Sequence, residues 1–173
     1  MKRIISVLFV LCFSISCFAQ ISRTFWGLTL GTSTKQQVKN VLVQKGYKIT
    51  TEPDGSYSVN PDNVSFGGGY WTYVSFGFVN GKLSTVWFQN NERQCPLALN
   101  DLYDKLKNSL DKKYSNYYYD LPLDNTSQNA VYDDGRTSIL LGVRNYNYMR
   151  YISISYEDNS LSKKKIQNAE DEL

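Results

Sequence analysis

The sequence predicts an α+β fold, in which tandem helix-plus-antiparallel-strand units form a sheet with helices packed on one face. Two stretches have helical periodicity, residues 34–45 and about 97–113, and each precedes several short strand-like stretches separated by turn residues. Each run of strands ends in a long hairpin. Helices that precede runs of adjacent strands favour an antiparallel sheet, because parallel strands need a crossover connection between each pair.

The longer predicted helix has apolar residues at the spacing of one helix face. These residues are Leu99, Leu102, Tyr103, Leu106 and Leu110. In the shorter helix, Ser33 and Gln36 have the spacing of a capping box at the first turn. Gly46 follows as a residue typical of a helix end. We therefore expect two amphipathic helices that each bury one side against the sheet.

The strongest hairpin signal is Asn80-Gly81, which joins the strand-like stretches 71–79 and 82–90. A type I′ turn places Val74 opposite Trp87 on one face of the sheet. A type I turn with a bulge at Gly81 instead shifts the pairing by one residue and sends Trp87 to the other face. Both registers put aromatic residues on both faces. One face can pack against the helices, and the other must be covered or remain as an exposed aromatic surface.

The remaining elements are read from alternation and turn residues. Further strands are expected at residues 47–51, near Tyr57, and at 64–67, 117–121, 129–132, 137–144 and 149–156. Turns are expected at Asp133-Asp134-Gly135 and Asn145-Tyr146-Asn147, and a polar loop at 124–128. This organisation predicts a single domain over residues 20–157, made of two similar units at about 25–92 and 96–157. Residues 158–173 are expected to form a flexible or helical tail.

The N-terminus reads as a removable export signal. Lys2 and Arg3 precede an apolar stretch, residues 4–13, that is short for a membrane span, and Ala19 stands where signal peptidase cleaves. Lipid attachment at Cys17 is the alternative, because small residues precede it. No later apolar run is long enough for a transmembrane helix. We therefore expect a protein of the bacterial periplasm or extracellular space.

Cysteine usage limits the disulfides that the exported chain can form. Cys12 and Cys17 belong to the signal, which leaves Cys95 as the one cysteine of the mature chain. An internal disulfide is therefore excluded, and the interpretations are a small buried apolar residue or a disulfide between two copies. The core must form by packing alone.

Charge and residue types exclude several classes of activity. Without Lys2 and Arg3, the nineteen Lys and Arg residues fall to seventeen, against sixteen Asp and Glu, so the mature chain is nearly neutral and no nucleic-acid partner is expected. The absence of histidine excludes Ser-His-Asp, Cys-His and histidine-containing zinc sites. We therefore predict no catalytic residues, no metal and no cofactor. An enzyme that uses Asp, Glu, Tyr or Lys is the remaining catalytic hypothesis.

The positive signal is aromatic, since all fourteen tyrosines lie beyond the export signal among many asparagines and serines. Tyr, Ser and Asn are typical of recognition surfaces, because tyrosine offers a large contact area at a low entropy cost. The same enrichment also arises in secreted β-rich proteins whose tyrosines cover a sheet. The candidate ligand-binding residues are Trp71, Tyr73, Trp87, Tyr117, Tyr118 and Tyr119.

Two segments of the first half carry a resemblance. Residues 25–33 (FWGLTLGTS), with the following helix, and residues 74–83 (VSFGFVNGKL) resemble a pattern in small exported Bacteroidetes proteins. The order of elements is distantly similar to that of the β-lactamase inhibitor protein family and of small outer-membrane assembly lipoproteins. Those relatives commonly present a sheet face to another protein. The inhibitor family has two-helix units with internal disulfides, whereas each unit here has one predicted helix and no disulfide.

The leading hypothesis from the sequence is a non-catalytic exported envelope protein that binds another macromolecule through an aromatic-rich surface. The alternative is a glycan-binding or small-ligand-binding protein, in which Trp71, Tyr73 or Trp87 stack on sugar rings. The expected partner is accordingly another envelope protein or a glycan.

Overall fold

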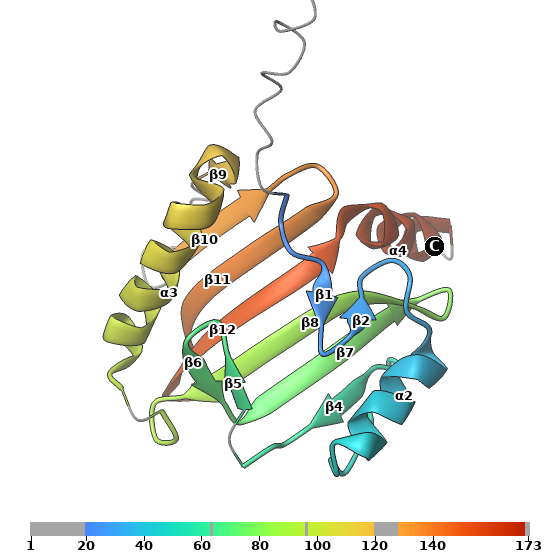
Figure 1. The fold of residues 1–173 in the computed structure, drawn as a ribbon, viewed down its shortest axis with the longest axis horizontal. Coiled ribbons are helices and arrows are strands. Elements are labelled where there is room, and N and C mark those ends of the chain that lie inside the picture. Colours follow the sequence, from blue (N-terminus) through green and yellow to red (C-terminus); the bar gives the residue numbers. More distant parts are fainter. Residues whose placement is uncertain (1–19, 63, 96, 120–127, 172–173) are drawn as a thin grey trace, which may run out of the picture.

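The computed structural model describes residues 20–62, 64–95, 97–119 and 128–171. The predicted signal segment 1–19 and residues 124–127 of the predicted polar loop lie outside the described residues. Within the described chain, the main sheet has eight strands in the order β3-β4-β7-β8-β12-β11-β10-β9, and every neighbouring pair is antiparallel (Figure 1). The predicted α+β class with an antiparallel sheet is confirmed.

The strands of the main sheet differ greatly in length. They are β3 (Thr50–Thr51), β4 (Tyr57–Val59), β7 (Tyr73–Val79), β8 (Lys82–Asn91), β9 (Tyr118–Tyr119), β10 (Gln128–Asp133), β11 (Thr137–Tyr146) and β12 (Met149–Asp158). The four long strands β7, β8, β12 and β11 are neighbours at the centre, and the short ones lie toward the edges. The strands that follow each helix form one half of the sheet, and the halves meet where β8 pairs with β12.

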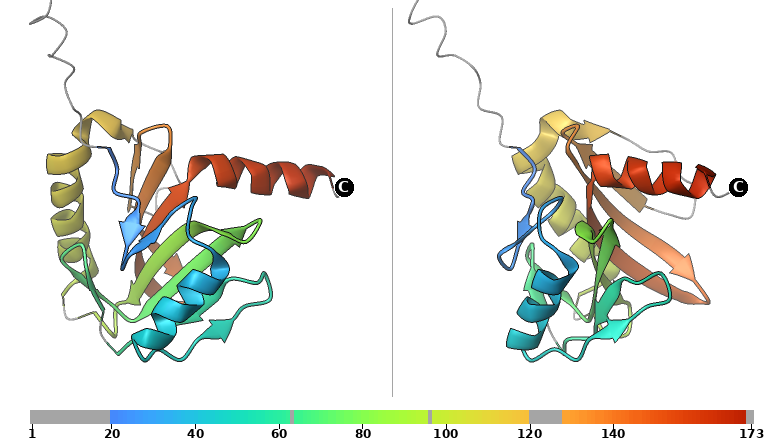
Figure 2. Two further views of the ribbon diagram at one scale, coloured as in Figure 1. Left: turned by 45° about the vertical axis from the view of Figure 1, so that its right-hand side comes forward. Right: turned by 90° about the vertical axis from the view of Figure 1, so that its right-hand side faces the viewer.

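Two helices and two small hairpins cover one face of this sheet (Figures 1 and 2). They are α2 (Lys35–Gln44), α3 (Leu99–Tyr114), β1 (Thr24–Phe25) with β2 (Leu28–Thr29), and β5 (Val64–Phe66) with β6 (Gly69–Trp71). A short 3₁₀ turn, η1 (Ser115–Tyr117), follows α3, and α4 (Asn159–Asp171) extends from the end of β12. No helix within the described ranges is long and apolar enough to cross a membrane.

The helix α2 begins one residue later than the capping-box prediction requires. Thr34, not Ser33, is the N-cap: its hydroxyl accepts a hydrogen bond from the Gln37 backbone N–H, and the Gln37 side chain accepts from the Thr34 N–H. Ser33 is already engaged, because its hydroxyl accepts from the Thr29 N–H at 2.8 Å. The helix end is as predicted, since Gly46 follows with a φ of +77°.

The helix α3 confirms the predicted apolar stripe. All five predicted positions are buried: Leu99, Leu102, Tyr103, Leu106 and Leu110. This face of α3 packs on β11 and β12. The helical spacing of apolar residues was therefore sufficient to predict both the element and the side that it buries.

The β7–β8 hairpin has the predicted two-residue turn but a different register further along. Asn80 and Gly81 both have positive φ, and Phe78 pairs with Leu83 as in the type I′ prediction. The register then shifts between Gly77 and Phe78, because β8 contains one extra residue, and Ser75 instead of Val74 pairs with Trp87. The uninterrupted type I′ pairing is therefore wrong. The irregularity lies within the strands and not at Gly81, and it places Trp87 on the face opposite Val74.

Other boundaries also differ from the prediction. The stretch expected as one strand at 71–79 is two, because β6 ends at Trp71 and β7 begins at Tyr73. The turn between β11 and β12 lies at Asn147 and Tyr148, both with positive φ, and not at residues 145–147. The segment after β12 is helical through Asp171.

Candidate functional site

The face of the main sheet opposite α2 and α3 is here called the open face (Figure 2). Strand pairing places the side chains of this face side by side in rows across the sheet. One row is Ser75, Trp87, Ser155, Leu140 and Val131. The next row is Tyr73, Gln89, Ser153, Gly142 and Asn129. The small residues Ser155, Ser153 and Gly142 in the middle of the rows leave a depression at the centre of the face, and larger side chains lie on either side of it.

A groove of about 780 Å³ follows from this arrangement. Its floor includes Ser75, Trp87, Ser153 and Ser155, and its walls come from three other places. These wall residues are Asp54 and Ser56 before β4, Asn145 and Tyr146 at the end of β11, and Lys165 of α4. Elements far apart in the sequence therefore enclose one open groove.

The charged residues of the groove balance one another. Asp54 and Glu157 are the acidic residues among the described lining, and Arg144 and Lys165 are the basic ones. The hydrogen bond from the Ser56 hydroxyl, with one from the Ser56 N–H, holds the pKa of Asp54 below its ordinary value. Asp54 is therefore ionised at neutral pH, and the groove carries no net charge.

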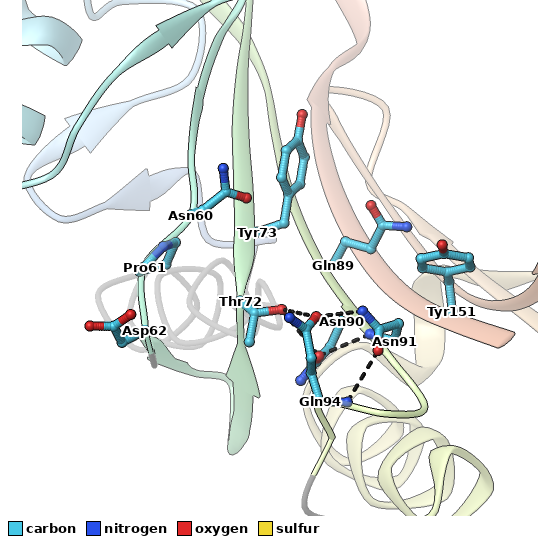
Figure 3. A pocket seen from close by; sticks show the side chains of 10 residues that line it. All are labelled: Asn60, Pro61, Asp62, Thr72, Tyr73, Gln89, Asn90, Asn91, Gln94 and Tyr151. Atoms are coloured by element: carbon cyan, nitrogen blue, oxygen red, sulfur yellow. Dashed lines mark hydrogen bonds between the residues drawn. The ribbon is translucent and has the colours of Figure 1, made fainter. Parts of the chain in front are cut away.

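A pocket of about 470 Å³ opens at one end of the groove (Figure 3). Its lining is rich in side-chain amides and hydroxyls: Asn60, Pro61, Asp62, Thr72, Tyr73, Gln89, Asn90, Asn91, Gln94 and Tyr151. Gln89 and Tyr151 also line the groove, so the pocket and the groove adjoin at these two residues. The pocket is here called the amide pocket.

Hydrogen bonds hold one side of the amide pocket in place (Figure 3). The Thr72 hydroxyl lies 3.2 Å from Asn90 Oδ1 and 3.0 Å from Gln94 Oε1. Asn90, which is 2% exposed, donates from Nδ2 to the Tyr70 carbonyl at 2.9 Å, and Asn91 donates from Nδ2 to Gln94 Oε1. This network fixes the amides on that side before any ligand arrives.

Other polar groups of the amide pocket are unengaged. Within the described part of the chain, the Gln89 amide and the hydroxyls of Tyr73 and Tyr151 make no hydrogen bond to another protein group. Gln89 lies between the two tyrosines (Figure 3). These groups can therefore bond to a ligand without breaking an internal hydrogen bond.

The structure brings together two of the six predicted ligand-binding residues. Tyr73 and Trp87 lie on the open face with their ring centroids 5.8 Å apart in an edge-on arrangement. Trp71 does not belong to this surface: it is fully buried, and its indole N–H donates to the Phe66 carbonyl at 2.9 Å. Its place in the covering hairpin β5–β6 turns it into the core.

The three consecutive tyrosines lie at the far edge of the sheet, away from the amide pocket. Tyr117 is half-buried against the core. The Tyr118 ring packs on Tyr132 and lies under the Lys107 ammonium, while Tyr119 is 45% exposed. Sequence clustering therefore did not predict which tyrosines share a site.

Apart from Tyr73, the residues of the amide pocket were not predicted from the sequence. A signal was present, because β8 and β12 both place polar or small residues at alternate positions, among them Gln89 beside Trp87 and Ser153 beside Tyr151. Asn60 carries no such signal, because it follows a three-residue strand. In the described ranges, no group of three or more Cys, Asp or Glu side chains is placed to hold a metal ion.

Comparison of the chain with protein-family models, with curated proteins and with solved structures finds no match in any of the three. The function is therefore inferred from the open face and its amide pocket.

Proposed function

We propose that this chain is a non-catalytic exported protein that binds another macromolecule through the open face of its sheet. The observation that carries the proposal is the contrast between the faces. One face is covered by α2, α3 and the two small hairpins, whereas the opposite face has an open groove of about 780 Å³.

The residues of the groove support binding more than they support a purely structural role. Trp87 and Tyr151 line it, and Tyr146 at its wall is 67% exposed. Aromatic rings that are partly exposed around a hollow surface offer contact area at a low entropy cost. The small side chains of Ser75, Ser153 and Ser155 on the floor, with Gly77 beside them, leave room for a partner to approach the sheet.

Two sequence features support the location. The basic and apolar N-terminal segment predicts export, and residues 25–33 and 74–83 resemble small exported proteins. The proposal places the protein in the bacterial envelope or outside the cell, with lipid attachment at Cys17 as the alternative to cleavage after Ala19.

The test is retention of a partner by the immobilised protein from the envelope fraction of the cells that make it. Ser153→Arg places a long cationic side chain on the groove floor, and Ser109→Arg makes the same substitution on the exposed side of α3. We expect the unchanged protein and Ser109→Arg to retain the same macromolecule and Ser153→Arg to lose it. Circular dichroism checks that both variants are folded.

Two results would contradict the proposal. One is that no protein or polysaccharide is retained by the unchanged chain. The other is equal retention by the Ser153→Arg and Ser109→Arg variants, which would place the contact away from the open face.

A further inference from the structure

We propose that the amide pocket binds sugar residues of a neutral oligosaccharide, and that the chain of the ligand continues along the groove. This inference rests on the proposed function, since it names the class of macromolecule that the open face binds. Five observations carry it: the type of polar groups, their fixed framework, the neighbouring aromatic rings, the charge and the volume.

The polar groups match the chemistry of a sugar. Side-chain amides present a donor and an acceptor side by side, and a tyrosine hydroxyl does both from one atom. Neighbouring hydroxyls of a sugar ring need such mixed partners. In the amide pocket, Gln89, Tyr73 and Tyr151 have these groups free within the described chain.

One side of the amide pocket, next to these groups, is organised in advance. Asn90 is held by Thr72 and by the Tyr70 carbonyl, and Asn91 and Gln94 are bonded to each other. Side chains that are already held lose little conformational entropy when a ligand binds. This matters for a sugar, because its hydroxyls exchange hydrogen bonds with water for hydrogen bonds with protein at a small net gain.

Aromatic rings continue from the amide pocket into the groove. Tyr73 lines the pocket, Trp87 lines the groove, and their rings meet edge-on at 76°. The C–H groups on one side of a sugar ring can pack on such a ring face, in a contact of apolar and weak hydrogen-bonding character. A ligand longer than one sugar can therefore contact the pocket and the groove together.

Charge and size distinguish the ligand from other polymers. Asp62, which is exposed, is the one charged residue among the described lining of the amide pocket, and the groove has two residues of each sign. Nucleic acids and acidic polysaccharides require clustered cations, which this surface lacks. The pocket volume of about 470 Å³ lies within the range of about 300–1,000 Å³ typical of small-ligand sites.

The experiment is calorimetric titration of the protein, expressed with its own N-terminal segment, against neutral hexasaccharides. The probes are β-1,4-glucan, β-1,3-glucan, α-1,4-glucan, β-1,4-xylan and β-1,4-mannan oligomers, with a hexamer of galacturonic acid as the charged comparison. We expect at least one neutral oligomer to bind and the charged one to bind more weakly.

Matched variants test whether the oligosaccharide binds in the amide pocket. Gln89→Ala and Tyr73→Ala are each expected to weaken binding about tenfold. Each variant removes a hydrogen-bonding group that faces the ligand, and a loss of about 1.4 kcal/mol corresponds to a tenfold loss of affinity. Gln36→Ala, on the exposed side of α2, and Tyr119→Ala, in the edge strand β9 and outside the amide pocket, are expected to stay within about twofold. Gln89→Glu and Tyr73→Phe, which keep side-chain size, provide the same comparison if an alanine variant fails to fold.

The inference is overturned if none of the neutral oligomers binds, if the charged oligomer binds best, or if the pocket variants bind as tightly as the controls. The retention experiment separates this failure from that of the proposed function. One outcome is that a protein partner is retained by the unchanged chain and lost with Ser153→Arg, while no oligosaccharide binds. This outcome supports the proposed function and overturns the inference that the ligand is a sugar. Failure of both measurements overturns both proposals.

Discussion

Arg23 forms an ion pair with Asp158, and this contact joins the start of the described chain to the end of β12. Both side chains are largely buried, with 17% and 5% of their surface exposed. Arg23 also donates to the Thr137 hydroxyl at 2.7 Å, and Asp158 accepts from the Leu161 N–H at 2.9 Å in the first turn of α4. One pair therefore connects the N-terminal segment, β11, β12 and α4.

The acid sensitivity of the fold is expected to depend on Asp158. Burial alone would raise the pKa of this carboxyl, but hydrogen bonds from Ser160, the Leu161 N–H and Arg23 outweigh it and hold the pKa below the ordinary 3.8. A lowered pKa in the folded state contributes stability that is present above the unfolded-state pKa of about 4 and is lost as pH falls through the folded-state pKa. The free energy of unfolding, measured by urea denaturation, should therefore decrease from about pH 5 to pH 2.

The Asp158→Asn variant separates this contribution from that of the other carboxylates. It should be less stable than the unchanged protein at pH 7 and should lose less stability on acidification. A variant with the same pH dependence as the unchanged protein would show that Asp158 does not cause the acid sensitivity.

The ion pair also makes Gly31 intolerant of a side chain. Gly31 has a φ of +76°, and a Cβ there would overlap Asp158 Oδ2 and lie 2.8 Å from the Arg23 guanidinium. Gly27 has nearly the same φ, +79°, with nothing within 4 Å of the added Cβ. Gly27→Ala should cost about 1–2 kcal/mol of unfolding free energy from backbone conformation alone.

Gly31→Ala should lower the unfolding free energy by at least about 2 kcal/mol more than Gly27→Ala does, because it also displaces a buried ion pair. Thermal and urea denaturation of the two variants measure the difference. Equal costs would mean that the ion pair shifts to accommodate the methyl group without loss.

Trp71 and Trp87 should differ strongly in their effect on stability. Trp71 is fully buried and hydrogen-bonded, so Trp71→Ala should cost about 3–5 kcal/mol. Trp87 is half-buried on the open face and contacts Tyr73, so Trp87→Ala should cost about 1 kcal/mol. Chemical denaturation checks both, and similar losses would place Trp87 in the core.

The Tyr132 hydroxyl should control the protonation of Asp111. Burial alone would raise the pKa of Asp111, but hydrogen bonds from Lys107 and from the Tyr132 hydroxyl, at 2.7 Å, lower it. Tyr132→Phe should therefore raise the pKa of Asp111 and cost about 1 kcal/mol of stability. An NMR titration of the Asp111 carboxyl measures the shift, and an unchanged pKa would show that Lys107 is sufficient.

Several elements could be predicted from the sequence because their signals are local. The apolar stripe of α3 needs no knowledge of distant residues, since helix periodicity alone places Leu102 and Leu106 on one side. The Asn80-Gly81 turn likewise depends on the positive φ that these two residues tolerate. The antiparallel α+β class follows from the order of such elements.

The composition of the candidate site could not be predicted in the same way. The amide pocket combines residues that follow β4, residues of β8 and a residue of β12, which are separated by up to ninety-one positions from Asn60 to Tyr151. Local patterns do not show which strands become neighbours. The tyrosines 117–119 are clustered in the sequence but lie at another edge of the sheet.

Trp87 shows most clearly which features follow from the sequence and which depend on the tertiary structure. Its residue type and its place in a hairpin strand follow from the chain alone, and so does the expectation that aromatic residues occupy both faces of the sheet. Its face depends on one extra residue in β8, which reverses the alternation of every side chain beyond it. The pairing of β8 with both β7 and β12 favours that register, because it buries Val86 and Phe88 under the helices and leaves Trp87 on the open face.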